Sequence, residues 1–216
     1  NPSEVQKEVI PEILNRKDLK VISCHLGNGG SITAIDSGRV VDTTMGFTPN
    51  AGLVMGTRSG DIDASFIPYV ISKSKKSLDE VISDLNKKSG LLGISGVSSD
   101  SRDIEAGVNE GDVRCVLAEE IYENKIVSYI ASYYCLLGGA DVICFAGGVG
   151  ENGITVRRNI INKLAPLGVK LDADANNVRG VVTKISSDES KVLCYLIPTD
   201  EELMIARDTY NLICGK

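Results

Sequence analysis

Three short β-rich runs near the start of the chain, followed much later by two apolar runs, constrain the fold more than any other feature. Residues 21–25, 31–35 and 39–44 are rich in valine, isoleucine and threonine, and short glycine turns separate them. This pattern predicts an antiparallel meander. Residues 141–145 and 191–197 are largely apolar, as in strands that are buried on both faces. Together the runs predict one α/β domain.

Helical patterns occupy most of the chain around these runs, in the order three strands, helix, strand, helix, strand, helix. The apolar periodicity from Val113 to Leu137 predicts one long helix. Capping boxes, in which Ser or Thr precedes Glu by three positions, predict two helix starts. Residues 45–61 and 89–103 are broken by glycine and polar residues and predict two long loops. The other predicted helices and the capping pairs are 2–17, 156–164, 199–213, Ser77 with Glu80, and Thr199 with Glu202.

Composition excludes several functional classes. The 216 residues carry a net charge of −6 with a pI near 4.9, which argues against a nucleic-acid-binding surface. No apolar run approaches the ~20 residues that a membrane helix needs, and no secretory signal opens the sequence. The six cysteines lack C-x-x-C spacing and mostly lie in apolar runs. We therefore expect free thiols and a reducing, cytoplasmic location.

Four segments rich in glycine and polar side chains lie beside predicted strand or helix ends, where α/β folds bind ligands. In the first, His25 to Ser31, glycines would let backbone N–H groups approach a phosphate, with Asn28 as a further donor. The alternative is a plain hairpin turn, which Asn-Gly favours. In the second, residues 56–61, Arg58 could reach a phosphoryl group or form an ordinary surface ion pair.

The other two segments are equally open when taken alone. In the third, residues 95–102, Asp100 and Arg102 could contact a nucleoside or simply cap a helix. The fourth contains G-x-G-x-x-G at Gly148, Gly150 and Gly153, which allows an NAD-binding oxidoreductase as an alternative. The pattern follows a strand that comes late in the sequence, after the meander, and no suitable ribose-binding acid follows it. Both observations argue against the dinucleotide fingerprint.

One carboxylate near the end of the chain is a candidate metal ligand. Glu201 opens the last predicted helix just beyond a strand, where it could hold Mg²⁺ directly or through water. The alternative is a favourable interaction with the helix dipole.

Taken together, the segments HLGNGGSITAI, GFTPNAGLVMGTRSGD, GISGVSSDSRDIE, AGGVGENG and IPTDEELMIAR resemble the acetate kinase family. Propionate kinases are very similar to that family. The resemblance runs from about residue 20 to the C-terminus. It implies an α/β domain of the sugar-kinase/Hsp70/actin (ribonuclease H-like) type, with a βββαβαβα core. It also implies reversible transfer of the ATP γ-phosphoryl group to acetate, giving acetyl phosphate and ADP, with Mg²⁺ and in a homodimer.

The same resemblance implies roles for individual residues. Arg58 would be the catalytic arginine, Pro49 would line the acyl pocket and Glu201 would bind Mg²⁺. Ser101 differs from the aromatic residue that some members have there. The residues implied to contact ATP are His25, Leu26, Gly27, Asn28, Gly29, Asp100, Ser101, Arg102, Gly148, Val149, Gly150, Glu151 and Asn152.

Family members are about twice this long, and the resemblance implies that residues 1–216 are a single C-terminal nucleotide-binding domain without the N-terminal one. We therefore expect weak Mg-ATP binding and little kinase activity from this chain alone. The long helix over residues 113–137 is the expected dimer surface. A module that only dimerises or scaffolds is a third hypothesis, beside the kinase and the oxidoreductase.

Overall fold

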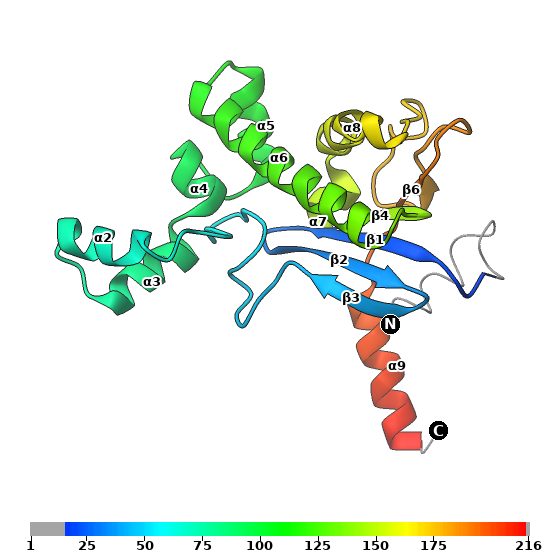
Figure 1. Cartoon of the computed structure of the whole chain (residues 1–216), viewed down its shortest axis with the longest axis horizontal. Coiled ribbons are helices and arrows are strands. Elements are labelled where there is room, and N and C mark those ends of the chain that lie inside the picture. Colours follow the sequence, from blue (N-terminus) through cyan, green and yellow to red (C-terminus); the bar gives the residue numbers. More distant parts are fainter. Residues whose placement is uncertain (1–15, 215–216) are drawn as a thin grey trace.

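A six-stranded mixed sheet lies at the centre of the computed structural model, which describes residues 16–214 (Figure 1). The strand order is β3-β2-β1-β4-β6-β5. Strands β1, β4 and β6 are parallel to one another, whereas β2, β3 and β5 are antiparallel to their neighbours. The bounds are β1 Lys20–Leu26, β2 Gly30–Asp36, β3 Arg39–Thr43, β4 Val142–Ala146, β5 Thr183–Lys184 and β6 Leu193–Leu196.

This sheet confirms the predicted meander and both buried strands. The two-residue strand β5 was not predicted, because two residues carry no usable periodicity. The main core lies between the sheet and helices α6 (Val113–Leu136) and α8 (Ile154–Lys163). A smaller buried cluster, which includes Val21, Val142 and Tyr195, lies on the strands' other side.

The long helix α6 confirms the prediction over 113–137, but its apolar residues serve two surfaces. Ile126 and Ile130 are fully buried in the core. Val113, Leu117 and Ile121 form a separate stripe that is exposed, with Val113 at 79% exposure. No helix within residues 16–214 combines the length and apolar character needed to cross a lipid bilayer.

Two segments predicted as irregular contain helices. The predicted loop over 89–103 holds α4 (Gly90–Ser95) and the start of α5 (Ser101–Asn109). The segment after β4 was predicted as a glycine turn, but it forms helix α7 (Gly147–Asn152), which begins directly after the strand. Glycine disfavours helix only by about 1 kcal/mol, so tertiary packing can override it. Residues 45–61 contain no helix or strand, as predicted.

The predicted helix starts have different outcomes. Helix α3 (Leu78–Lys87) has the full capping box, in which the Ser77 side chain accepts from the Glu80 N–H and Glu80 accepts from the Ser77 N–H. The predicted capping box of Thr199 with Glu202 was wrong. The Asp200 carboxylate accepts the Leu203 N–H at 2.9 Å, so Asp200 caps α9 (Glu201–Cys214) instead of Thr199.

Two further predictions are partly met. Of the predicted helix over 2–17, residues 1–15 lie outside the described residues, and Arg16 and Lys17 are not helical. All six cysteines are free; Cys24, Cys115, Cys144 and Cys194 are buried as expected, whereas Cys135 and Cys214 are exposed.

Candidate functional site

A cavity of about 720 Å³ opens where the carboxyl ends of β1 and β4 meet. Parallel strands bring the segments that follow them to one sheet edge, and α/β folds bind ligands there. Six separate parts of the chain line the cavity, and three of them were predicted from the sequence. The predicted residues in its wall are Gly27, Asn28, Asp100, Ser101, Arg102, Gly148, Val149 and Asn152.

The first segment is both a hairpin turn and part of the cavity wall. Gly27 and Asn28 connect the antiparallel strands β1 and β2, so the plain-turn alternative is also correct. A Cβ on Gly56 would lie 2.0 Å from the Asn28 Oδ1 atom, so glycine at position 56 makes room for that side chain. His25 and Leu26 belong to β1, and Leu26 is fully buried in the core, away from the cavity wall.

The fourth segment forms α7, which runs along the cavity. Gly147 has a φ of +76°, and a Cβ there would lie 2.7 Å from the Leu26 carbonyl oxygen. Only glycine meets both conditions at this strand-to-helix turn. Gly148, Val149 and Asn152 line the cavity, whereas Gly150 packs against Phe145.

Glu151 joins α7 to the segment after β6 instead of lining the cavity. Its Oε1 atom accepts from the N–H groups of Gly147 and Thr199 and from the Thr199 hydroxyl, each at 3.0 Å. The ATP contact that the family resemblance implied for Glu151 stays a prediction. The side chain fixes the position of α7.

The dinucleotide interpretation of the same glycines finds no support in this geometry. In that fingerprint the glycines form the turn between a strand and a helix. Here Gly148 and Gly150 lie inside α7, and Gly153 lies between α7 and α8. The turn is made by Gly147, which is outside the G-x-G-x-x-G pattern.

The third segment shows the helix cap, and the nucleoside contact stays a prediction. Asp100 caps α5 by accepting the Arg102 N–H at 2.9 Å, and both residues line the cavity. The Arg102 guanidinium also donates to Asp100 from Nε (3.0 Å) and NH2 (2.6 Å). This charge-assisted pair lowers the pKa of Asp100 to about 2. The Arg102 guanidinium is thereby held against Asp100.

Arg58 lies next to the cavity rather than in its wall. Its NH1 atom donates to the Pro49 carbonyl oxygen at 3.1 Å and lies 3.0 Å from the position of a Cβ on Gly29. The structure thus brings Arg58 and Pro49 together beside the β1–β2 turn.

Asp61 holds this arginine loop in place. Its carboxylate accepts the Gly52 N–H at 2.8 Å, the Tyr129 hydroxyl and the Lys125 ammonium at 3.0 Å. Tyr129 and Lys125 both belong to α6, so the loop is fastened to the longest helix. Burial first, and then the bond to Asp61, raise the pKa of Tyr129 well above its usual range.

Sequence reasoning missed five residues of the cavity wall. Apolar residues such as Leu91, Tyr122 and Val156 carry no signal that separates a ligand pocket from a core. Arg179 is an isolated arginine outside any recognised motif. The five are Leu91, Glu105, Tyr122, Val156 and Arg179, whereas Ser99 and Gly153 lie within segments that the sequence singled out.

The predicted metal ligand cannot be placed. Glu201 begins α9, but its side chain lies outside the described residues. Within the part of the chain that the structure describes, no three His, Cys, Asp or Glu side chains gather as a metal site would require.

Comparison with known proteins agrees with the resemblance. Residues 5–207 match the Acetokinase family. The chain is 54% identical over 199 residues to the acetate kinase of Treponema denticola, covering 92% of this chain and 50% of that protein. The crystal structure of Porphyromonas gingivalis acetate kinase superimposes with a TM-score of 0.88 at 41% identity, covering 94% of this chain and 51% of that one. A propionate kinase from Francisella tularensis superimposes with a TM-score of 0.84 at 44% identity, covering 90% and 50%. The chain spans about half the length of these relatives.

Proposed function

Since the chain belongs to the acetokinase family, we propose that it is the nucleotide-binding half of an acetate kinase. In this reaction a carboxylate oxygen of acetate attacks the γ-phosphorus of ATP, the bond to the bridging oxygen breaks, and ADP and acetyl phosphate form; the reverse reaction makes ATP. Propionate is the alternative acceptor, because a propionate kinase is among the similar structures.

The observation that carries the proposal is the convergence of separate glycine-rich segments on one cavity. Gly27 and Asn28, Asp100 to Arg102, and Gly148 to Asn152 are far apart in the sequence but line the same 720 Å³ space. That volume is within the range of small-molecule sites. The β1–β2 turn supplies glycine N–H groups and the Asn28 amide for phosphates, and the opposite end has apolar walls for a base.

Arg58 has the position that a charge-stabilising residue needs. It lies beside the phosphate end of the cavity, against Gly29 and Pro49. Phosphoryl transfer is catalysed mainly by positioning and by cations around the transferred group, which suits a guanidinium at this place. Pro49 beside it would contribute to the acyl pocket.

Magnesium fits this scheme as an ion held mostly by the nucleotide. Mg²⁺ in kinases is bound through one or two carboxylates together with substrate phosphates and water. Glu201 is the carboxylate proposed to hold it. When bound, the ion would neutralise charge on the phosphates.

We further propose that residues 1–216 form one C-terminal domain and that the remaining catalytic groups come from the half that the relatives have in addition. On this view the chain alone binds Mg-ATP weakly and turns over little. The free thiols are consistent with a cytoplasmic protein. The exposed stripe of Val113, Leu117 and Ile121 is consistent with a homodimer surface; Leu117→Glu should then shift a dimer toward monomer in sedimentation.

Nucleotide binding by the purified chain tests the central proposal. ATP with Mg²⁺ should raise the thermal midpoint, and NAD should not. Asn28→Ala should weaken ATP binding by about 1.5–3 kcal/mol, tenfold or more, because a bond to a charged phosphate is lost. The matched control is Asn162→Ala, since Asn162 is exposed on α8 and does not line the cavity. Stabilisation by NAD instead of ATP would overturn the proposal.

A further inference from the structure

Arg179 is a cation on the cavity wall that the mechanism above does not use. It is exposed, and within residues 16–214 no hydrogen bond or ion pair engages its side chain. Most other charged groups near the cavity are already committed; Arg102, for example, is paired with Asp100. An unengaged guanidinium in a cavity wall is available to a ligand.

A buried arginine fixes the segment that carries Arg179. Arg157 has no exposed surface, and its guanidinium makes five hydrogen bonds, one for each of its donors. The acceptors are the carbonyl oxygens of Gly150, Glu151, Asn176 and Val178 and the Asn176 Oδ1 atom, all at 2.8–2.9 Å.

These bonds tie the end of α7 to the backbone just before Arg179. The Gly180 N–H adds a bond to the Glu151 carbonyl oxygen at 3.3 Å, so the backbone is held on both sides of position 179. Burial first, and then the charge of Arg179, lower the pKa of Arg157 to about 10.

The position of Arg179 along the cavity indicates what part of a nucleotide it meets. Gly148 lies near the start of α7 and next to the Gly27 turn, whereas Asn152 and Gly153 lie at its other end with Arg179. Six helical residues rise about 9 Å, which is comparable to the separation of the phosphates from the base in an extended nucleotide. Phosphates at the Gly27 turn therefore place the base near Arg179.

The cavity wall is poor in aromatic partners for a base. Among the residues that line it in the described chain, only Tyr122 is aromatic, and it is 5% exposed. Guanidinium planes are the usual substitute, since they stack on aromatic rings. We propose that Arg179 stacks on the nucleobase of the bound nucleotide and that Arg157 is the residue that positions it. This inference rests on the proposed nucleotide site.

The test compares a ligand with a base and one without. For the purified chain, Arg179→Ala should weaken ADP binding about five- to thirtyfold, the range expected for a desolvated cation–π contact. Its affinity for inorganic tripolyphosphate, which has no base, should not change. Arg179→Lys keeps the charge but loses the plane, so it should resemble Arg179→Ala. The matched control is Arg158→Ala, an exposed arginine on α8 outside the cavity.

Three results would overturn the inference: unchanged ADP affinity in Arg179→Ala, full recovery by Arg179→Lys, or an equal loss for tripolyphosphate, which would indicate a phosphate contact. Each variant is first checked for an unchanged thermal midpoint in the absence of ligand. A wild-type chain that does not bind ADP would overturn the proposed function itself, so the two failures are distinguishable.

Discussion

Helix α6 and the α2–α3 lobe, made of α2 (Phe66–Ser74) and α3 (Leu78–Lys87), are held to the protein in different ways. Helix α6 buries seven side chains and contacts α4, α5, α8 and two strands. Helix α2 buries none, and α3 buries only Val81 and Leu85. In Figure 1 the lobe extends beyond the edge of the sheet, whereas α6 lies across the strands.

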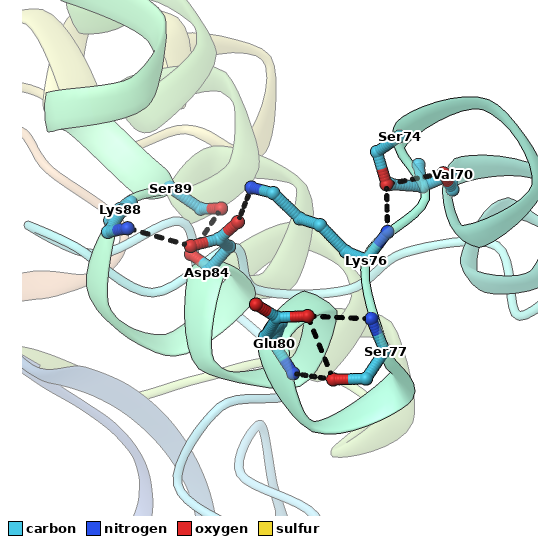
Figure 2. A network of polar contacts seen from close by, with 8 residues as sticks. All are labelled: Val70, Ser74, Lys76, Ser77, Glu80, Asp84, Lys88 and Ser89. Atoms are coloured by element: carbon cyan, nitrogen blue, oxygen red, sulfur yellow. Dashed lines mark hydrogen bonds and ion pairs between the residues drawn. The ribbon is translucent and has the colours of Figure 1, made fainter.

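The lobe depends instead on local polar contacts, which Figure 2 shows. Lys76 and Lys88 both pair with Asp84, and the Ser89 hydroxyl donates to the Asp84 carbonyl oxygen at 3.0 Å. The capping box of Ser77 and Glu80 starts α3. Exposed ion pairs contribute about 0–1 kcal/mol each, far less than buried apolar side chains. The cavity is therefore built mainly on the well-packed region, and the end of α3 is joined to the Arg58 loop by the Ser59 N–H, which donates to the Leu85 carbonyl oxygen at 2.9 Å.

The largest expected effect comes from truncating the core. Ile130→Ala should lower the free energy of unfolding by about 2–5 kcal/mol, because Ile130 is fully buried between α6 and the sheet. The matched change in the lobe is Ile82→Ala, at a side chain that is 41% exposed, and should cost about 0.5 kcal/mol. Urea denaturation measures both. Equal losses would show that the lobe is as tightly packed as α6.

A second, smaller effect separates the buried turn before α7 from an exposed loop. Gly147→Ala should cost about 2–4 kcal/mol, because the new Cβ would meet the Leu26 carbonyl oxygen at 2.7 Å in addition to the strain at φ +76°. Gly180→Ala should cost about 1 kcal/mol, because φ is +61° but nothing lies within 4 Å of the Cβ. Thermal unfolding of the two variants compares them. A Gly180 variant as unstable as the Gly147 variant would argue against the steric explanation.

Regular patterns made much of the fold predictable. Three alternating runs and two apolar runs gave five of the six strands, and a long periodic segment gave α6, because those signals come from burial itself. The errors fell on glycine-rich segments. There α4 and α7 form although the composition favours loops, since packing against β1 and α6 outweighs a propensity cost of about 1 kcal/mol per glycine.

The cavity was predictable only where its residues lie in glycine-rich motifs. Asn28, Asp100 and Gly148 are recognisable because backbone turns and polar donors suggest a ligand. Tyr122 and Val156 look like core residues, and Arg179 becomes meaningful only once Arg157 is seen to fix its segment. Glu151 also belongs to the motif, but its side chain accepts the Thr199 N–H and does not line the cavity.

Loss of the capping box should have a local effect. Ser77→Ala should destabilise α3 by about 1 kcal/mol, because the Glu80 N–H loses its acceptor. Hydrogen exchange should show faster exchange in α3 and unchanged protection in α6. The control is Ser83→Ala, an exposed position on α3 for which no hydrogen bond is seen. If the amides of α6 lose the same protection as those of α3, lobe and core unfold as one unit and the contrast between them is wrong.

The smallest effect concerns two carboxylates that form ion pairs, Asp100 in the cavity wall and Asp84 in the α2–α3 lobe. Arg102 lowers the pKa of Asp100 to about 2, and Lys76 and then Lys88 lower the pKa of Asp84. A depressed pKa stabilises the fold above the ordinary Asp value of about 3.9, and that contribution is lost as the pH falls through the folded value. For Asp100 the loss therefore falls between about pH 4 and pH 2.

Arg102→Gln should move the pKa of Asp100 upward, though not fully to 3.9, since the backbone N–H of residue 102 still donates to it. Lys88→Gln should raise the pKa of Asp84 less, because Lys76 remains its main partner. Carboxyl ¹³C NMR titration measures both, and a larger rise at Asp84 than at Asp100 would show that the exposed lobe, not the cavity wall, holds its charges in the more rigid geometry.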